Sequence, residues 1–420
     1  MKFANPGDVS FTRRSWLRSV ALASAAVACP LPGAAAGKRA KPTGLDEPQQ
    51  AALRGVINEA ISKKLIPGAS LLVLSRGDVV FREAFGHTEF EEERAFTPEL
   101  PCFIASLSKP ITATYFASLD ERGVISLDDP VEKFLPEFKG IRVQEKGPAV
   151  TKLRVWHLLS HRSGLPGNAD MGDERPQWLA RAAGADPGAA AAAPGGVSLK
   201  QVIDGWIQES LRAEPGERFA YGSSGYMVAA RIAEVVMGKR FEQLLEKGLL
   251  DPVGMKATTF HPNAETMRRV PARYVSTPNG TRREPRAMPL PAEGGLINPA
   301  GGLCSRLDDL AAFLALHLNR GIAGEKRLLK PESLARMYRP HPPRATEAAD
   351  GGGQGYGLGW NVMAPGGFVR HLGGSGTLAW LDLRREHAGV LLTQVKWGPT
   401  RAIIPRLIKE VQAIFPEGGD

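Results

Sequence analysis

Cysteine is scarce in this chain, which has three cysteines among 420 residues. One of them, Cys29, lies near the N-terminus, so Cys102 and Cys304 alone remain if a leader is removed there. Two cysteines cannot form the disulfide framework that stabilises small secreted domains. We therefore expect Cys102 and Cys304 to behave as small buried hydrophobic residues.

The spacings that typically bind metals or nucleotides are also missing. His157 and His161 lie four residues apart, but no HExxH or CxxC pattern accompanies them. Metal sites usually need three or four ligands, so the two histidines are interpreted as structural. No nucleotide-binding glycine loop follows a strand pattern. The sequence predicts an activity that needs neither a metal nor another cofactor.

Long runs of one residue class are absent as well. The apolar segments fall short of the roughly 20 residues that span a membrane, so no transmembrane helix is predicted. The net charge is +9, but no run of five or six basic residues occurs. Nucleic-acid binding is therefore not expected. The hydrophobic content of 43% predicts a sizeable folded core.

The N-terminus has the pattern of an export signal. Arg13 and Arg14 precede a short apolar stretch, Val20 to Ala28, and then the small residues Ala34 to Ala36. A basic segment, a short apolar segment and an A-x-A site describe a bacterial signal peptide. The paired arginines favour the twin-arginine route. We predict a signal peptide over residues 1–36 and a periplasmic or extracellular protein.

Two features adjoin this leader. Ala26 to Cys29 loosely resembles a lipoprotein signal, so a lipid anchor at Cys29 is the alternative to cleavage after Ala36. Residues 37–48 are polar and are predicted to form a linker. A single catalytic domain is then expected over residues 49–415.

The pattern within this domain predicts an α/β (α+β) fold, an antiparallel sheet flanked by helices with an inserted all-helical lobe. Strand patterns occur at both ends, over about 49–105 and 350–415, while helical patterns fill about 106–349. One sheet built from both chain ends is therefore expected. Ala182 to Val197 consists almost entirely of Ala, Gly and Pro and is predicted to be a surface loop.

The segment around Ser106 carries the strongest chemical signal. Pro110 lacks an N–H and its ring clashes with the carbonyl four residues earlier, so Ser106 must lie at or beside a helix N-terminus. Lys109 then lies one turn further on the same face. A serine hydroxyl needs a base, and a partly buried lysine can act as one. Ser106 is therefore the candidate nucleophile and Lys109 its neighbour.

Two further segments contain candidate site residues. Tyr221 and Ser223 lie in a glycine-rich loop before a helix pattern, and a tyrosine near a cation can act as acid or base. His371, Gly373 and Gly374 lie on a predicted C-terminal strand, where glycines allow a ligand to approach the backbone.

The order Ser-x-x-Lys, Tyr-x-Ser and His-x-Gly resembles the signature of the serine β-lactamase and penicillin-binding protein superfamily, in particular its class C-like members. Further segments in matching order extend this resemblance over roughly residues 50–415: Leu127–Pro130, Phe134–Pro136, Leu158–Pro166, Pro215–Gly216, Pro252–Met255, Ala300–Leu303 and Tyr356–Trp360.

The resemblance implies a role for each candidate. Ser106 would be acylated, Lys109 would assist as base, and Tyr221 would pass a proton to the leaving group and later activate water. The backbone N–H groups of Ser106 and Gly374 would form the oxyanion hole. The remaining residues of the second and third motifs would bind substrate: His371, Gly373 and Ser223. Which of Lys109 and Tyr221 is the base stays open.

The sequence departs from the family pattern at two positions. Ser223 stands where Asn is common, and His371 stands where Lys is typical of β-lactamases and peptidases. Histidine is mostly neutral at neutral pH, so attraction for a substrate carboxylate is reduced at that position. This favours a serine hydrolase of the esterase, amidase or D-peptidase type acting on a small ester, amide or peptide.

Three alternatives remain. One is a β-lactamase or D-Ala-D-Ala carboxypeptidase that acts on peptidoglycan-like substrates. Another is an envelope-binding protein without catalysis, although such a protein does not need Ser106, Lys109 and Tyr221 together. An α/β-hydrolase is the weakest, because its G-x-S-x-G motif fails at Thr377.

Overall fold

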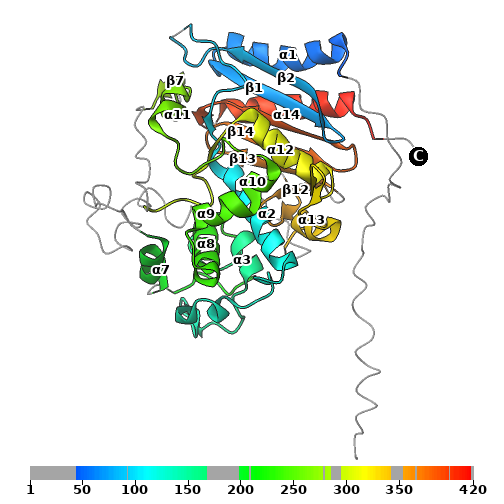
Figure 1. Ribbon diagram of the computed structural model, residues 1–420. Coiled ribbons are helices and arrows are strands. Elements are labelled where there is room, and N and C mark those ends of the chain that lie inside the picture. The colour runs from blue at the N-terminus through cyan, green and yellow to red at the C-terminus, as the bar shows by residue number, and fades with distance from the viewer. Residues whose placement is uncertain are drawn as a thin grey trace, which may run out of the picture. The chain divides into compact units, whose positions relative to one another are not determined.

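The computed structural model describes most of the predicted catalytic domain (Figure 1). The predicted signal peptide, Cys29 and the Ala182–Val197 segment lie outside the described residues. The described residues are 44–91, 93–167, 198–207, 210–277, 280–284, 295–341, 353–364, 367–396 and 398–417. Across these ranges, no helix is both long enough and apolar enough to cross a membrane.

The end of the predicted linker belongs to the first helix. Helix α1 spans Glu47–Ser62, so residues 47–48 are helical and the linker cannot extend to residue 48. The side chain of Asp46 accepts a hydrogen bond from the backbone N–H of Gln49, whose own side chain bonds back to Asp46. Pro48 fits because the first helical turn needs no N–H donor.

The central sheet is built from both chain ends, as predicted. Its order is β11-β12-β13-β14-β15-β1-β2, and every neighbouring pair is antiparallel. Arg76 and Gly77 have positive φ values of 51° and 90°, which suits the two-residue turn of the β1–β2 hairpin. The strands are β1 (Gly68–Ser75), β2 (Asp78–Gly86), β11 (Gly355–Tyr356), β12 (Asn361–Ala364), β13 (Phe368–Gly373), β14 (Thr377–Asp382) and β15 (His387–Leu392).

Helices cover both faces of this sheet. Leu71 and Val73 of β1 pack in one core with α1 and the C-terminal helix α14 (Pro399–Ile414). Leu72 and Leu74 point the other way, into a core shared with α12 (Leu307–Leu318) and the inserted helices. Because both faces are covered, all eight residues of β1 are buried. Figure 1 shows α1 and α14 on the side of the sheet away from the inserted helices.

One expected strand is interrupted. The alternation over Tyr356 to Met363 is typical of a continuous strand, but the structure forms a hairpin of β11 and β12. Gly359 has a φ of +81° in the connecting turn, and a Cβ there would come within 2.9 Å of the Cα of Pro110. The turn therefore packs directly onto the helix that begins beside Ser106.

The inserted region is mainly helical but not entirely so. Its helices are α2 (Ser108–Glu121), α3 (Val155–Leu159), α7 (Leu199–Ile207), α8 (Ser224–Met237), α9 (Phe241–Leu245), α10 (Asp251–Val253), α11 (Ala264–Arg269) and α13 (Pro331–Met337), besides α12 on the sheet. Short strands accompany them: β3 (Cys102–Phe103) with β8 (Cys304–Ser305), β4 (Arg142–Val143) with β5 (Gly147–Pro148), β9 (Ile322–Ala323) with β10 (Lys326–Arg327), and β6 (Tyr274–Thr277) with β7 (Gly280–Arg283) and β16 (Val395–Lys396).

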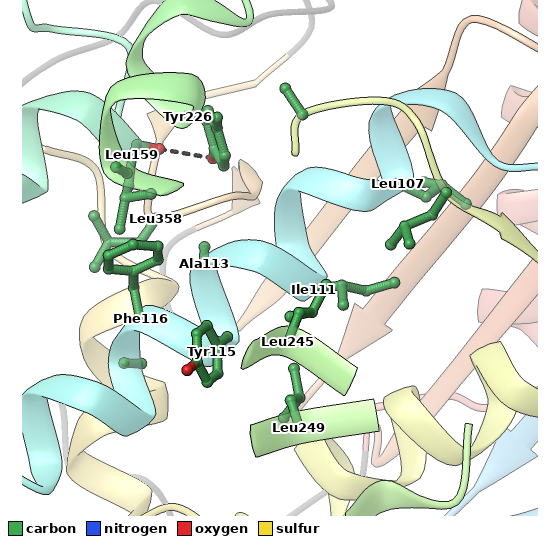
Figure 2. Close-up of a cluster of buried hydrophobic side chains, with 14 of the residues drawn as sticks. Leu107, Ile111, Ala113, Tyr115, Phe116, Leu159, Tyr226, Leu245, Leu249 and Leu358 are labelled. Carbon is green, nitrogen blue, oxygen red and sulfur yellow. Dashed lines mark hydrogen bonds between the residues drawn. The ribbon is translucent and has the colours of Figure 1, made fainter. Parts of the chain in front are cut away.

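Helix α2 runs through the middle of the larger core. Its residues from Ser108 to Leu119 are all buried. The rings of Tyr115 and Phe116 pack against Phe241 of α9, with centroids 6.0 and 6.4 Å away. Figure 2 shows these side chains and Ile111 pointing from α2 into the neighbouring helices. A helix held on all sides gives Ser106 and Lys109, at its start, a rigid support.

The two cysteines lie on paired strands but cannot form a disulfide. Cys102 is opposite Ser305 and Cys304 is opposite Phe103, so the two thiols point to opposite faces of the β3–β8 ribbon. Burial raises the pKa of both thiols, that of Cys304 to about 12. We predict that a chain beginning after residue 36 keeps two free thiols when the folded protein is held with oxidised glutathione. Thiol titration in denaturant measures this, with protein oxidised while unfolded as control. A mass lower by two hydrogens after folded oxidation would contradict it.

Candidate active site

Ser106 lies in a short turn between a strand and the central helix. Strand β3 ends at Phe103, a 3₁₀ turn spans Ala105–Leu107, and α2 begins at Ser108. Ala105 has a φ of +46°, a left-handed conformation that costs a non-glycine residue roughly 1–3 kcal/mol. The Ser108 hydroxyl steadies this turn by donating to the Ala105 carbonyl and accepting from the N–H of Leu303.

Lys109 lies beside Ser106 and is almost completely buried, with 2% of its surface exposed. Its Nζ donates to Ser106 Oγ over 3.2 Å and to the Ala300 carbonyl over 3.0 Å. The same Nζ lies 4.6 Å from the ring centroid of Tyr221, within the range of a cation–π contact. The Ser-x-x-Lys spacing thus brings an amine and a hydroxyl into direct contact.

Tyr221 reaches this pair from the loop that precedes α8. Ser223 is the residue before the helix, and Ser224 anchors the loop by donating to the Pro166 carbonyl over 2.7 Å. Gly225 allows α8 to touch α3, since a Cβ there would lie 2.3 Å from the Leu158 carbonyl oxygen. Tyr226 adds a hydrogen bond from its hydroxyl to the Leu159 carbonyl, visible in Figure 2.

The end of β13 forms the opposite wall. A Cβ at Gly373 would lie 2.4 Å from the carbonyl oxygen of Ile104, so the strand touches the segment that leads to Ser106. Thr377 secures the contact by donating to the same carbonyl over 3.0 Å. Gly374 follows in the turn between β13 and β14. The lack of a side chain at Gly373 therefore allows β13 to lie directly against the segment before Ser106.

His371 is neutral in this environment. Burial, and then the nearby charge of Lys109, lower the pKa of His371 to about 3. Its Nδ1 lies 2.9 Å from the Leu372 carbonyl oxygen, so Nδ1 carries the proton and donates there. Its Nε2 then accepts from the Tyr356 hydroxyl, 3.0 Å away. His371 consequently offers no positive charge to a substrate.

These segments enclose one cavity of about 700 Å³. It contains every site residue predicted from the sequence: Ser106, Lys109, Tyr221, Ser223, His371, Gly373 and Gly374. They come from the start of α2, the loop before α8 and the end of β13, three segments far apart in the chain. Within the described parts of the chain, no three His, Cys, Asp or Glu side chains gather closely enough to ligate a metal ion.

The sequence did not identify the loop of Asn298, Pro299 and Ala300, which forms hydrogen bonds with Lys109 and Thr112. Ala300 supplies the carbonyl that accepts from Lys109, and the Asn298 side chain accepts from the Ala300 N–H over 3.0 Å. Thr112 of α2 donates to the Pro299 carbonyl over 2.7 Å. The only signal was the Ala300–Leu303 family segment, because a backbone carbonyl has no residue type that a pattern could reveal.

The fold and this cavity define a protein of the β-lactamase and transpeptidase class. A model of the Beta-lactamase family matches residues 53–413, and the chain belongs to that family of hydrolases. This confirms the family resemblance and the fold class predicted from the sequence.

One curated relative and two solved structures illustrate what this chain is similar to. Esterase EstB of Burkholderia gladioli is 28% identical over 360 residues, covering 79% of this chain and 84% of that protein. The structure of an octameric penicillin-binding protein homologue from Pyrococcus abyssi has a TM-score of 0.67 and 26% identity, covering 88% of this chain and 79% of that one. EstCE1, a hydrolase with promiscuous acyltransferase activity, shares the fold with a TM-score of 0.73 at 22% identity, covering 86% and 98%.

Proposed function

We propose that this protein is an exported serine hydrolase that cleaves an ester or amide through an acyl-enzyme on Ser106. The observation that carries the proposal is the contact of a buried lysine with a serine at the start of a rigid helix, over 3.2 Å. The leader pattern over residues 1–36 supports export.

In acylation, Ser106 Oγ attacks the acyl carbon while its proton passes to the Lys109–Tyr221 pair. The bond from the acyl carbon to the leaving oxygen or nitrogen then breaks, and Tyr221 delivers a proton to that atom. In deacylation, water attacks the same carbon, gives up its proton to the pair and releases Ser106. The contact of Lys109 Nζ with the Tyr221 ring, at 4.6 Å, keeps both groups at the reacting centre.

The negative charge that develops on the acyl oxygen needs donors. The backbone N–H groups of Ser106 and Gly374 are proposed for this role, because both residues line the cavity. Backbone donors held by a helix start and a strand end need no reorganisation during the reaction. The direct packing of Gly373 against Ile104 supports this arrangement by fixing the distance between the two walls.

The third motif supports an esterase or amidase over a β-lactamase. His371 is neutral and engaged with Tyr356, so it does not replace the lysine that typical family members carry there. The likeness to esterase EstB is consistent with this choice. A fluorophosphonate probe followed by intact-mass analysis tests the nucleophile without knowledge of the substrate. One adduct that maps to Ser106 supports the proposal, and an adduct on another serine, or none, contradicts it.

The charge of the cavity lining supports a preference for anionic substrates. Besides Lys109, four cations line it: Arg218, Arg273, Lys396 and Arg401. No Asp or Glu occurs among the described residues of this lining. Glu284, just outside, pairs with Lys396 over 2.7 Å and with Arg273 over 3.3 Å. Cations in a cleft attract anions and accelerate their binding.

We predict that p-nitrophenyl hydrogen succinate is hydrolysed with a kcat/KM roughly tenfold above that of p-nitrophenyl butyrate at low salt. The two esters have acyl chains of equal length and differ by a terminal carboxylate. The ratio should shrink at about 0.5 M NaCl, where screening is strong, and in Arg218→Gln and Arg401→Gln.

Arg76→Gln removes the same charge from the β1–β2 turn, outside this cavity, and is the matched control for net charge. A ratio near one, or a ratio that neither salt nor the two cavity variants changes, would contradict the anionic preference.

A further inference from the structure

We propose that His161 is a positioning residue of this site, which holds Tyr221 in place for proton delivery to the leaving group. The inference rests on the function proposed above for Tyr221. His161, which the sequence analysis interpreted as structural, lies after α3, beyond the helix end at Leu159.

His161 accepts hydrogen bonds from the residues on either side of Tyr221. Its backbone carbonyl accepts from the N–H of Ala220 over 2.8 Å. Its side-chain Nδ1 accepts from the N–H of Gly222 over 3.4 Å. Its ring also packs on the Tyr221 ring, with centroids 4.5 Å apart. One residue therefore contacts the Tyr221 loop before, at and after the tyrosine.

The backbone of His161 is strained in a way that serves these contacts. Its φ is +59°, a left-handed conformation that is unfavourable for a histidine. Neighbouring hydrogen bonds hold it there, from Gly216 N–H to the Arg162 carbonyl and from Arg212 N–H to the Gly164 carbonyl, both over 2.7 Å. In this conformation the carbonyl and the ring of His161 meet the same loop.

The protonation of the ring fits a role as acceptor. Because Nδ1 accepts from Gly222, the single proton of the neutral ring lies on Nε2. Nε2 is buried without a hydrogen-bond partner. Burial first, and then the nearby charge of Lys109, hold the pKa of His161 well below its usual range. An apolar side chain would fill this place without leaving a buried N–H unpaired. We therefore attribute the presence of a histidine here to the hydrogen bond that its Nδ1 accepts from Gly222.

The role of Tyr221 gives this inference a specific readout. An alkoxide must be protonated as it leaves, whereas p-nitrophenolate leaves as a stable anion. A displaced Tyr221 should therefore slow the acylation step for alkyl esters far more than for p-nitrophenyl esters. When two esters share one acyl group they form the same acyl-enzyme, so their kcat/KM values compare acylation alone.

The variants are chosen for the left-handed backbone. His161→Gly adopts this φ without strain and removes only the ring, while His161→Ala is the second deletion variant. His161→Asn also tolerates the conformation, and its Oδ1 can accept from Gly222 in place of Nδ1. His157→Ala is the matched control, because His157 is buried to the same 3% but bonds to the N–H of Arg154 instead.

We expect the kcat/KM of His161→Gly for an alkyl acetate to fall by about 100-fold, the scale of loss from a catalytic group misplaced by about 1 Å. For p-nitrophenyl acetate it should fall only about threefold, and His161→Asn should recover most of the difference. His157→Ala should keep the wild-type ratio between the two esters. Active protein is counted by fluorophosphonate labelling of Ser106.

Equal losses for the two esters, or no recovery in His161→Asn, would overturn the inference. Tyr221→Phe separates it from the proposed function. If Tyr221→Phe itself lacks the selective loss with alkyl esters, the assigned role of Tyr221 fails. If Tyr221→Phe has the selective loss and both His161 deletion variants lack it, only the positioning role of His161 fails.

Discussion

Replacing Ser106 by alanine is expected to lower kcat/KM for ester hydrolysis by roughly 10⁴-fold or more, the scale found when a hydrolase loses its nucleophile. The Ser106 hydroxyl accepts from Lys109 Nζ over 3.2 Å, and alanine leaves no atom to form the acyl bond. Steady-state kinetics with a p-nitrophenyl ester measures the loss. The fluorophosphonate adduct should disappear together with the activity.

Ser375→Ala is the control for this prediction. Ser375 lines the same cavity, but it belongs to the turn between β13 and β14 and has no contact with Lys109 among the hydrogen bonds of the described residues. It should keep the fluorophosphonate adduct. A Ser106→Ala variant that is still labelled, or that keeps more than about a tenth of the activity, would show that the nucleophile lies elsewhere, and the envelope-binding alternative or another hydrolase site would then be favoured.

Mild acid is expected to destabilise the fold strongly. Five of the eight histidines are buried and His341 is half-buried, and desolvation lowers the pKa values of all six: His157, His161, His317, His341, His371 and His387. The pKa falls to about 3 for His317 and to about 4 for His341. These groups stay neutral when folded but bind a proton below about pH 6.5 when unfolded.

The sign follows from this difference. Between about pH 6.5 and the lowered pKa values the unfolded chain binds more protons, so stability falls as the pH falls. At about pH 5 each of the six imidazoles contributes a loss of about 1–2 kcal/mol, and the group about 6–12 kcal/mol. Domains are stable by only about 5–15 kcal/mol. Urea unfolding at about pH 7 and pH 5 should therefore differ severalfold in free energy.

A single histidine allows a matched test. His317→Gln removes a fully enclosed imidazole, whose Nδ1 lies 2.6 Å from the Tyr338 hydroxyl, and should flatten the pH dependence by about one proton. His87→Gln is the control, because it changes an exposed histidine that directly follows β2. Equal unfolding free energies at the two pH values would contradict the prediction.

Local chemistry made much of the fold readable in advance. The turn at Arg76 and Gly77 joins two β-rich segments into the β1–β2 hairpin, because its left-handed positions suit glycine. The clash of Pro110 with the carbonyl four residues earlier predicted where Ser106 lies relative to α2, and the 3₁₀ turn at Ala105–Leu107 is at that position.

The sequence by itself determined which segments of the two chain ends build the sheet and which residues of the three motifs meet in the cavity, because each depends on a local pattern or an ordered motif. Tertiary structure alone decided three features: the interruption of the expected strand at Gly359, the hydrogen bond from Lys109 to the Ala300 carbonyl, and the contacts of His161 with the Tyr221 loop. Each of these is a contact between segments far apart in the chain, and such contacts depend on packing that no local pattern records.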